Sequence, residues 1–486
     1  AVGADSSSAV SLFVSAAGRF AGDWPTFGGS TRHAGYHPAR LGKARFVTAW
    51  SATVAPGRPL NRAATGDGKV YVTPQTYFGG SFSAKALDLE TGATAWSHAF
   101  KEAYSLNPPT YHNGRVYIQR GNHEGDTQLW SLDSGTGVAA WSSPHGAQWE
   151  NYEAPTVTDS GIWVNGGSYG GLYGFSPAGK QTFFRSLAQY DGWTPTMSDG
   201  RLFTWVAGSF LEHNPADGST LWSVDAGWEW AGWSMDTVSA VSGDSAVVVS
   251  TTGIICIDLA SRSIRWKKTG NFRGSPAIAG GRAYASQEKA VASYSLTDGA
   301  AGPLIKVPET IVSGQPLVLM DHLFVASETK TYVISLATSS VVETLSGGGL
   351  LSFANGHLLA AGMDGILRAW YAEGGLDFIS APPTVVANGK ADDSKVDLES
   401  FVVDPSGSSS HRWQITASSN ASIFSSLRID RKGMLRISYA PYLSGSSFIT
   451  VEVTNGSGES ASATFEVILP KLPSPSVKLD RSVRLN

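Results

Sequence analysis

One short segment recurs along this chain, in which an aliphatic strand leads into a small or acidic turn and an aromatic residue closes the hairpin. Five copies are evident, at Ala86–Trp96, Trp130–Trp141, Gly174–Phe184, Glu212–Trp222 and Cys256–Trp266. Their closing aromatic residues follow one another after 45, 43, 38 and 44 residues. A period of about 42 residues is typical of the blades of a β-propeller, in which each unit buries its apolar faces against its neighbours.

Each unit is expected to contain four short strands. The second strands are the clearest, and eight of them begin at Val70, Val116, Ile162, Leu202, Ala246, Ala283, Leu323 and Leu358. The eighth unit stops after its third strand, at Trp370, whereas Phe46–Trp50 has the pattern of a fourth strand with no unit of its own. Because closure removes exposed sheet edges, we expect this N-terminal strand to complete the last blade.

The segment Ala86–Trp96 and the entry Asp23–Tyr36 resemble the PQQ-like (quinoprotein dehydrogenase-like) β-propellers. The first carries the pattern Ala-x-Asp-x-x-Thr-Gly-x-x-x-Trp, and the resemblance covers about residues 20 to 378. It implies a fold more than a chemistry, because the Trp is expected to pack between blades and the Thr-Gly pair to form the turn.

Some members of the resembled family are PQQ-dependent dehydrogenases, which need a catalytic Asp, a calcium site of Glu, Asn and Asp, and a stacking Trp. Glu150, Asn151, Asp236 and Trp233 have suitable residue types here, but no spacing singles them out. Many of these enzymes also carry a vicinal cysteine pair, which the sole cysteine, Cys256, cannot supply. The blades are short, as in the non-enzymatic assembly lipoproteins of the family, so we expect no cofactor and no metal.

The composition of the sequence changes after Phe378, where Ser-rich segments of alternating apolar and polar residues replace the aromatic repeat. These segments resemble the Ig-like and cadherin-like modules of bacterial surface proteins, especially at Ile429–Pro441. The predicted fold class is therefore all-β: an eight-bladed β-propeller closed by an N-terminal strand, followed by an Ig-like β-sandwich. The predicted divisions are an extension at 1–22, the propeller at 23–378, the sandwich at 381–470, and a linker or the start of a further module at 471–486.

Charge and composition exclude some classes of function. The 36 Lys and Arg against 40 Asp and Glu give a net charge of −4, which argues against a nucleic-acid partner. No apolar run approaches the length of about 18 residues needed to span a membrane. The small residues that follow Ala1 resemble the mature end of an exported protein, which predicts an extracellular or cell-surface location.

Ligands of propellers usually bind at the mouth face, where the loops from the fourth strand to the next blade and from the second to the third strand surround the channel. Aromatic and polar side chains gather in these loops, and such platforms suit sugar rings or the anchors of a protein partner. The candidate ligand-binding residues are Trp149, Glu150, Tyr152, Tyr190, Trp193, Trp228, Trp230, Trp233, Arg273 and His123. The alternative is that the aromatics plug the channel or pack between blades.

The function we expect is an exported, non-catalytic binding or assembly module, with a protein or a glycan bound at the mouth. An alternative is a polysaccharide lyase or hydrolase using His123, His145, Tyr190 and Arg273, and a less favoured one is a PQQ-dependent dehydrogenase. His33 and His37 are spaced as helix neighbours, but no helix or third ligand is expected there, so we predict no zinc site.

The two ends of the chain alternate apolar and polar residues as half-buried strands do, at Ala9–Ser15 and Ser476–Leu485. Such strands could pair with the sheet of another subunit and drive self-assembly into filaments. The alternative is that both ends are frayed.

Overall fold

The computed structural model describes residues 20–470, apart from 21, 43, 77–79, 122–126, 148–150, 168, 231, 374, 379–380, 388–392, 405–409, 442 and 457. These residues form two compact units. The first runs to Ala372 and omits residues 42–44, which belong with the second unit from Glu373 onward. Each unit is described by itself below.

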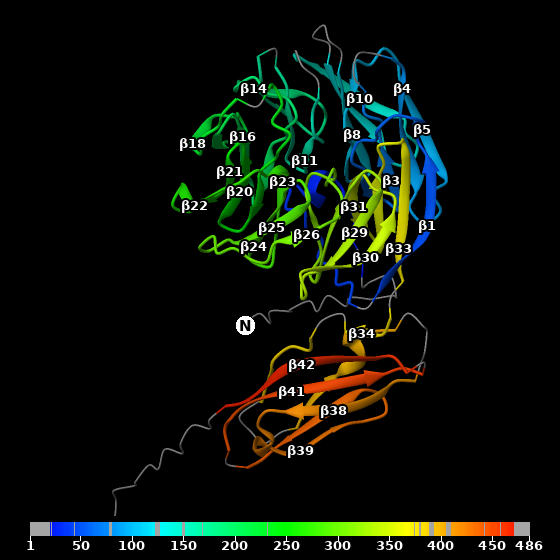
Figure 1. The fold of residues 1–486 in the computed structure, drawn as a ribbon, viewed down its shortest axis with the longest axis vertical. Coiled ribbons are helices and arrows are strands. Elements are labelled where there is room, and N and C mark those ends of the chain that lie inside the picture. The colour runs from blue at the N-terminus through cyan, green and yellow to red at the C-terminus, as the bar shows by residue number, and fades with distance from the viewer. Residues whose placement is uncertain are drawn as a thin grey trace, which may run out of the picture. The chain divides into compact units, whose positions relative to one another are not determined.

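The first unit consists of antiparallel sheets, eight of them in the described residues, each with four strands in chain order except where noted (Figure 1). We number the sheets as blades. Blade 1 has β2 (Ala64–Gly66), β3 (Lys69–Val72), β4 (Phe82–Asp88) and β5 (Thr94–Phe100). Blade 2 has β6 (Ser105–Leu106) and β7 (Thr110–His112), which both pair with β8 (Arg115–Gly121), then β9 (Thr127–Asp133) and β10 (Ala139–His145). Blade 3 has β11 (Thr156–Thr158), β12 (Gly161–Asn165), β13 (Gly171–Phe175) and β14 (Gln181–Ser186).

The remaining blades follow the same plan. Blade 4 has β15 (Thr196–Ser198), β16 (Arg201–Val206), β17 (Ser209–His213) and β18 (Thr220–Asp225). Blade 5 has β19 (Ala240–Ser242), β20 (Ser245–Ser250), β21 (Gly253–Asp258) and β22 (Ser263–Thr269). Blade 6 has β23 (Arg273–Ala279), β24 (Arg282–Ser286), β25 (Ala290–Ser295) and β26 (Ile305–Lys306). Blade 7 has β27 (Leu317–Val318), β28 (His322–Ala326), β29 (Lys330–Ser335) and β30 (Ser340–Ser346).

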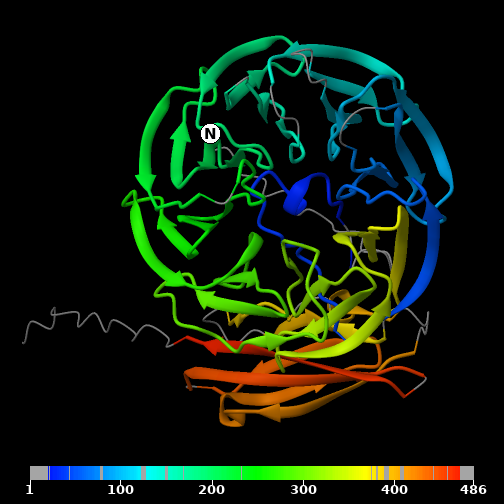
Figure 2. The ribbon, with the colours of Figure 1, turned by 45° about the horizontal axis from the view of Figure 1, so that its top comes forward.

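Blade 8 is built from both ends of the unit. β31 (Leu350–Ala354), β32 (His357–Ala361) and β33 (Ile366–Glu373) pair in order, and β1 (Arg45–Thr53) pairs with β33 as the fourth strand. Figure 2 shows the sheets arranged around a ring, with the blue β1 beside the yellow β33. The all-β propeller fold is confirmed, and the strand at Phe46–Trp50 closes the last blade as the sequence predicts.

The recurring aromatic residue joins each blade to the next one. Trp96 closes blade 1, donates its Nε1 hydrogen to the Ser134 carbonyl at 2.9 Å, and covers Gly137 in the turn of blade 2. Trp50 likewise covers Gly92 in the turn of blade 1, and its Nε1 hydrogen is donated to the Leu89 carbonyl at 2.8 Å. Since a Cβ on Gly92 would lie 2.6 Å from the Trp50 ring, the turn requires glycine to let the indole approach.

One predicted repeat position is wrong by a residue. Register places Phe183, not Phe184, opposite Gly174, where Trp96 lies opposite Ala86. Phe183 is buried and packs on Gly218 of blade 4, whereas Phe184 is 38% exposed. The turn of blade 3, closed by the hydrogen bond from Lys180 N–H to the Ser176 side chain and by Gly179, is one residue shorter than the others, which shifts the aromatic position.

The entry segment, which we define as residues 22–37, lies across the centre of the ring (Figure 2). Its backbone carbonyls accept hydrogen bonds from backbone amides of the blades, taken in chain order. Each donor lies in the first strand of its blade or directly after that strand. The donors are Thr65, Tyr111, Met197, Val241, Ile278 and Val318, with Asn355 of blade 8 donating to Gly22. His33 contacts blade 3 through Thr156 at 3.2 Å. Each blade is thereby tied to one central segment, which closes that end of the channel.

The entry segment contains the 3-10 helix η2 (Phe27–Gly29) and a turn closed by the hydrogen bond from the His33 amide to the Ser30 carbonyl. His33 bonds the Phe27 carbonyl through Nδ1 at 2.8 Å and the Pro195 carbonyl through Nε2 at 2.9 Å, and burial lowers its pKa. Both ring nitrogens of His33 are used in holding the ring together, so the histidine has a structural role.

The second unit contains a four-stranded and a three-stranded sheet around one apolar core that includes Leu398, Leu435, Ile449 and Val467. The first sheet has β35 (Val385–Val386), β42 (Ser460–Leu469), β41 (Gly445–Thr454) and β38 (Arg412–Ser418). The second has β36 (Ser394–Asp397), β40 (Met434–Tyr439) and β39 (Phe424–Ile429). A short pair, β34 (Asp377–Phe378) and β37 (Val402–Val403), and the turns η3 (Leu398–Phe401) and η4 (Ala421–Ile423) complete the unit. Its classification as Ig-like stays a prediction.

The predicted terminal strands at Ala9–Ser15 and Ser476–Leu485 lie outside the described residues.

Candidate functional site

A polar cavity of about 340 Å³ occupies the channel of the propeller. The residues that precede the first strands of the blades form most of its wall, and Phe27 of the entry segment contributes from below. Its lining includes Asn61, Arg62, Gln75, Asn151, Glu153, Asp236, Ser275, Gln315 and Met363. A neighbouring cavity of about 400 Å³ shares Asn61, Gln75 and Asn151 and extends over blades 1 and 2. In the first cavity, Asn61, Arg62, Asn151, Glu153 and Asp236 come from the loops that precede the first strands.

Arg62 is the buried cation of this channel, with an exposed fraction of 7%. It reaches from blade 1 to blades 8 and 7, where it donates to the carbonyls of Leu351 at 2.8 Å and Ser313 at 2.9 Å. Its guanidinium also lies over the Phe27 ring, 5.1 Å from the centroid. Burial lowers the pKa of Arg62, and Glu153 opposes that shift. Arg62 therefore fastens three blades and the entry segment at the base of the cavity.

Three carboxyl groups surround the mouth on blades 3 to 5. Removal from solvent raises the pKa of Glu153 to about 7, with Arg62 lowering it and Asp236 raising it. Removal from solvent likewise raises the pKa of Asp191 to about 6, with the Ser234 hydroxyl lowering it and Asp236 raising it. Asp236 accepts a hydrogen bond from Ser234 at 2.6 Å. Carboxyl groups that titrate near neutral pH are common at functional sites, although structural networks also produce them.

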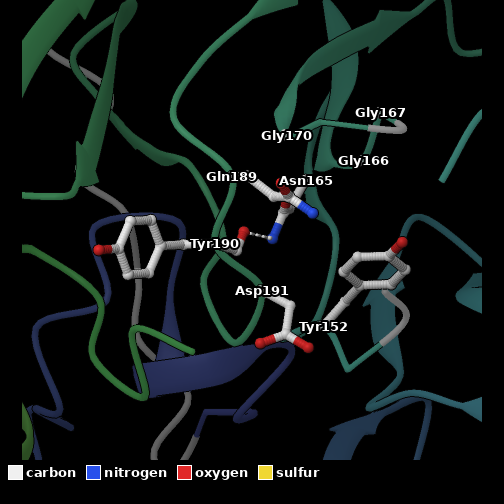
Figure 3. A pocket seen from close by; sticks show the side chains of 8 residues that line it. All are labelled: Tyr152, Asn165, Gly166, Gly167, Gly170, Gln189, Tyr190 and Asp191. Atoms are coloured by element: carbon white, nitrogen blue, oxygen red, sulfur yellow. Dashed lines mark hydrogen bonds between the residues drawn. The ribbon is translucent and has the colours of Figure 1, made fainter. Parts of the chain in front are cut away.

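A much smaller cavity lies beside these carboxylates, lined by Tyr152, Asn165, Gly166, Gly167, Gly170, Gln189, Tyr190 and Asp191. In the view of Figure 3, the rings of Tyr152 and Tyr190 lie on opposite sides of it, and Asn165 donates to the Tyr190 carbonyl at 3.4 Å. Its volume of about 10 Å³ is room for about one water molecule. This cavity is too small for a ligand.

Exposed aromatic rings stand on the rim of blades 3 to 5. Trp230 is 63% and Trp233 is 54% exposed, and their rings meet edge to face with centroids 4.6 Å apart. The half-buried Tyr190 lies 6.3 Å from Trp230. We call these three residues the aromatic patch. Large exposed aromatics that cluster in this way are unusual on a solvent-facing loop and mark interaction surfaces.

The loop that carries the two tryptophans is held in place by its neighbours. Trp228 packs on the core of blades 4 and 5 and meets Trp205 edge to face. The Asp191 amide donates to the Trp233 carbonyl, and the Met235 amide donates to the Asp191 carbonyl, both at 2.9 Å. The backbone at Trp233 and Met235 is therefore bonded to the neighbouring loop at Asp191.

The structure brings only part of the predicted site to the surface. Trp230, Trp233 and Tyr190 form the patch, whereas Arg273 is exposed on β23 of blade 6. Tyr152 is 3% and Trp193 is 1% exposed, and Trp193 donates to the Tyr190 carbonyl from within the blade core. Trp193 lies in the core of blades 4 and 5, whereas Tyr152 is buried but lines both the channel cavity and the smaller cavity. Trp149, Glu150 and His123 lie outside the described residues.

His145, a catalytic residue of the alternative enzyme hypothesis, has a structural environment. His145 is buried, bonded to Gln119 at 3.2 Å, and burial lowers its pKa to about 4, so it is neutral near pH 7. Sequence reasoning missed Arg62, Glu153 and Asp191 as site residues. Each stands two to five residues before the first strand of its blade, so superposing the repeat units on one another would have drawn attention to that position.

The ring of blades and its polar mouth define a PQQ-like β-propeller. Residues 47–192 and 206–302, together half of the chain, match the family model described as outer membrane protein assembly factor BamB. The chain belongs to this family. No curated protein sequence matches the chain.

Solved structures of this fold include a BamB and two dehydrogenases. BamB from Moraxella catarrhalis is 12% identical with a TM-score of 0.55, and the match covers 67% of this chain and 100% of that one. A europium-containing methanol dehydrogenase is 12% identical with a TM-score of 0.57, over 72% and 98% of the two chains. Quinohemoprotein alcohol dehydrogenase ADHIIG from Pseudomonas putida HK5 is 13% identical with a TM-score of 0.55, over 74% and 81%. At these identities the likeness shows the fold alone.

The residue types of the dehydrogenases' calcium site, Glu, Asn and Asp, occur together in the lining of the channel cavity as Glu153, Asn151 and Asp236. However, no three His, Cys, Asp or Glu side chains among the described residues are placed to hold a metal ion. Trp233 stands on the outer rim against Trp230 and gives the channel no stacking plane. Cys256 is buried in β21. No helix in the described part of the chain is long and apolar enough to cross a membrane.

Proposed function

We propose that this chain is an exported, non-catalytic binding or assembly module of a cell-surface or extracellular protein, and that its partner binds the mouth face of the propeller. The observation that carries the proposal is the exposed pair Trp230 and Trp233, of which Trp233 is bonded through its carbonyl to the Asp191 amide. Each ring leaves more than half of its surface in water, and the burial of that surface against a partner would release about 25 cal/mol for each Å² covered.

Membership of the BamB-like family supports a protein partner, since the family description names an assembly factor. A glycan partner is the other reading of the patch, because sugar rings also stack on exposed indoles.

The proposal is tested on arrays of peptides and glycans probed with the intact labelled chain and with the double variant W230A/W233A. Leu221→Ala is the matched control, because Leu221 is 56% exposed on β18, the outer strand of blade 4. The proposal expects bound probes to be lost in the double variant, retained in the control, and recovered chemically unchanged. Binding that persists in the double variant, or bound probes that are cleaved, would overturn it.

A polysaccharide hydrolase or lyase is a second candidate, favoured by the raised pKa values of Glu153 and Asp191. A carboxyl group that stays protonated near neutral pH is suited to general acid catalysis. The test is release of sugar ends from a panel of neutral and uronate polysaccharides. Activity that falls at least a hundredfold in Glu153→Gln, with the fold intact, would establish the enzyme in place of the binding module.

A further inference from the structure

The mouth loops of blades 3 to 5 combine aromatic rings with negative charge and carry no basic side chain. The connecting loops at residues 146–155, 187–195 and 226–239 contain no Lys, Arg or His. The loops between second and third strands on these blades, at 166–170, 207–208 and 251–252, contain none either. The carboxylates of the described connecting loops are Glu153, Asp191, Glu229 and Asp236.

Two basic side chains from outside these loops come close to them, Lys267 at the edge of blade 5 and Arg62 in the channel. Lys267 on β22 donates from Nζ to the Ala226 carbonyl at 3.4 Å, on the outer side of the loop that carries the tryptophans. The buried Arg62 is committed to backbone carbonyls at the base of the channel. No basic side chain on these loops therefore neutralises the carboxylates around the aromatic patch.

From this juxtaposition we infer that the aromatic patch binds a basic segment of a protein partner, seating arginine or lysine side chains on the faces of Trp230 and Trp233. The inference rests on the proposed function and names the chemistry of its partner. Trp gives the strongest attraction of any side chain for a cation over its face. The two rings are perpendicular, with an interplanar angle of 89°, so together they offer faces in two directions.

The charges of the patch favour the same occupant. Glu229 is exposed directly before Trp230 in sequence, and Asp236 is exposed three residues after Trp233 on the same loop. A carboxylate beside an aromatic face adds an ion pair to the cation–π contact and steers a positive segment toward the surface at low salt. Arginine is the better match than lysine, because its planar guanidinium can stack on an indole while its N–H groups donate to a carboxylate.

The same distribution argues against an anionic ligand at this place. A uronate polymer or an acidic peptide would bring its carboxylates against Glu229, Asp191 and Asp236 with no cation on those loops to receive them. Arg273 could pair with a carboxylate of such a ligand, but it lies on β23 of blade 6, beyond blade 5.

The experiment titrates fluorescently labelled peptides with the full chain and follows anisotropy. Three peptides of one design differ only in carrying arginine, lysine or citrulline, since citrulline keeps the shape of arginine without its charge. A chito-oligosaccharide of similar length serves as the neutral glycan probe. We expect the arginine peptide to bind at least tenfold more tightly than the citrulline peptide, with lysine between them.

Variants of exposed residues locate the binding surface. W230A/W233A is expected to weaken binding of the arginine peptide at least tenfold, and Leu221→Ala to leave it unchanged. Glu229→Gln is expected to weaken it about threefold at low salt and to make it less sensitive to added salt. Circular dichroism and the thermal midpoint check that each variant is folded.

Equal affinity for arginine and citrulline peptides, or no loss in W230A/W233A, would overturn the inference. Preferential, tryptophan-dependent binding of the chito-oligosaccharide would also overturn it while leaving the proposed binding function intact. Failure of every probe to bind below millimolar concentration would overturn the inference, and the array experiment would then decide the proposed function separately.

Discussion

The contact between Gly92 and Trp50 joins the closing strand β1 to blade 1, and it can be weighed by substitution. Gly92 has φ of +70°, and a Cβ there would lie 2.6 Å from two atoms of the Trp50 ring. Gly68 in the same blade has φ of +66° and nothing within 4 Å of the corresponding position. Alanine at either site is therefore strained by its backbone, but only Gly92→Ala also collides with a neighbouring blade.

The magnitudes follow from these two terms. A left-handed backbone costs an alanine about 1–2 kcal/mol, partly offset by about 0.4–1 kcal/mol of lost unfolded-state entropy, so Gly68→Ala should cost about 1 kcal/mol. Forcing a methyl group into a packed contact adds about 1–3 kcal/mol, so Gly92→Ala should cost about 2–4 kcal/mol. In the double variant G92A/W50A the collision is absent, so its cost should fall below the sum of the single variants by about 1–3 kcal/mol.

The assay is equilibrium unfolding in urea, followed by circular dichroism, for the wild type, the three single variants and the double variant. Equal costs for Gly92→Ala and Gly68→Ala, together with additivity of the cycle within about 0.5 kcal/mol, would refute the claim that the recurring aromatic locks each blade onto the turn of the next.

Four further predictions concern other parts of the chain. Gly192→Ala should weaken binding at the patch, because a Cβ there would meet the Ser234 hydroxyl at 2.2 Å. Gly200→Ala is the control, since Gly200 has a similar φ and open space around it, and it should leave binding unchanged. Peptide anisotropy measures both variants. Glu153 has a raised pKa, so its contribution to stability is present below its unfolded pKa and is lost as pH rises toward 7; Glu153→Gln should remove that loss, by about 1–3 kcal/mol, in urea unfolding at pH 5 and pH 8. Partial burial lowers the pKa of His411, but the carboxylates of Glu399 and Asp404, at 2.8 Å and 3.1 Å, raise it above its usual value overall. The second unit should therefore lose stability as the pH rises through that pKa. His411→Gln should flatten the pH dependence of the thermal midpoint of this unit. Removing residues 1–18 and 471–486 should reduce assembly seen by light scattering if the terminal strands pair between subunits; a monomeric full chain of equal stability would end that hypothesis.

The repeat and its closure were predictable because they depend on local patterns. The turn from Asp88 to Gly92 shows why: the Asp88 carboxylate accepts hydrogen bonds from the backbone and hydroxyl of Thr91, so neighbouring residues determine the hairpin. The orphan strand around Trp50 could be assigned to blade 8 because the last unit lacked a strand.

The site was harder to predict because its members meet only in the folded ring. Trp193 and Trp233 both stand in aromatic-rich loops, yet one fills a blade core and the other faces solvent. Nothing in the local sequence separates them, since their burial depends on neighbouring blades. The entry segment is held through backbone carbonyls, which leave no mark on residue type, and Arg62 finds its partners in blades 7 and 8, far along the chain.

Amide hydrogen exchange of the full chain, with and without the arginine peptide, tests most directly whether the mouth face of blades 3 to 5 is the binding surface. The account predicts slower exchange in residues 187–192 and 226–236 when the peptide is bound, with the outer strands β14, β18 and β22 unchanged. Protection confined to those outer strands or to the second unit, with the two mouth segments unaffected, would contradict it.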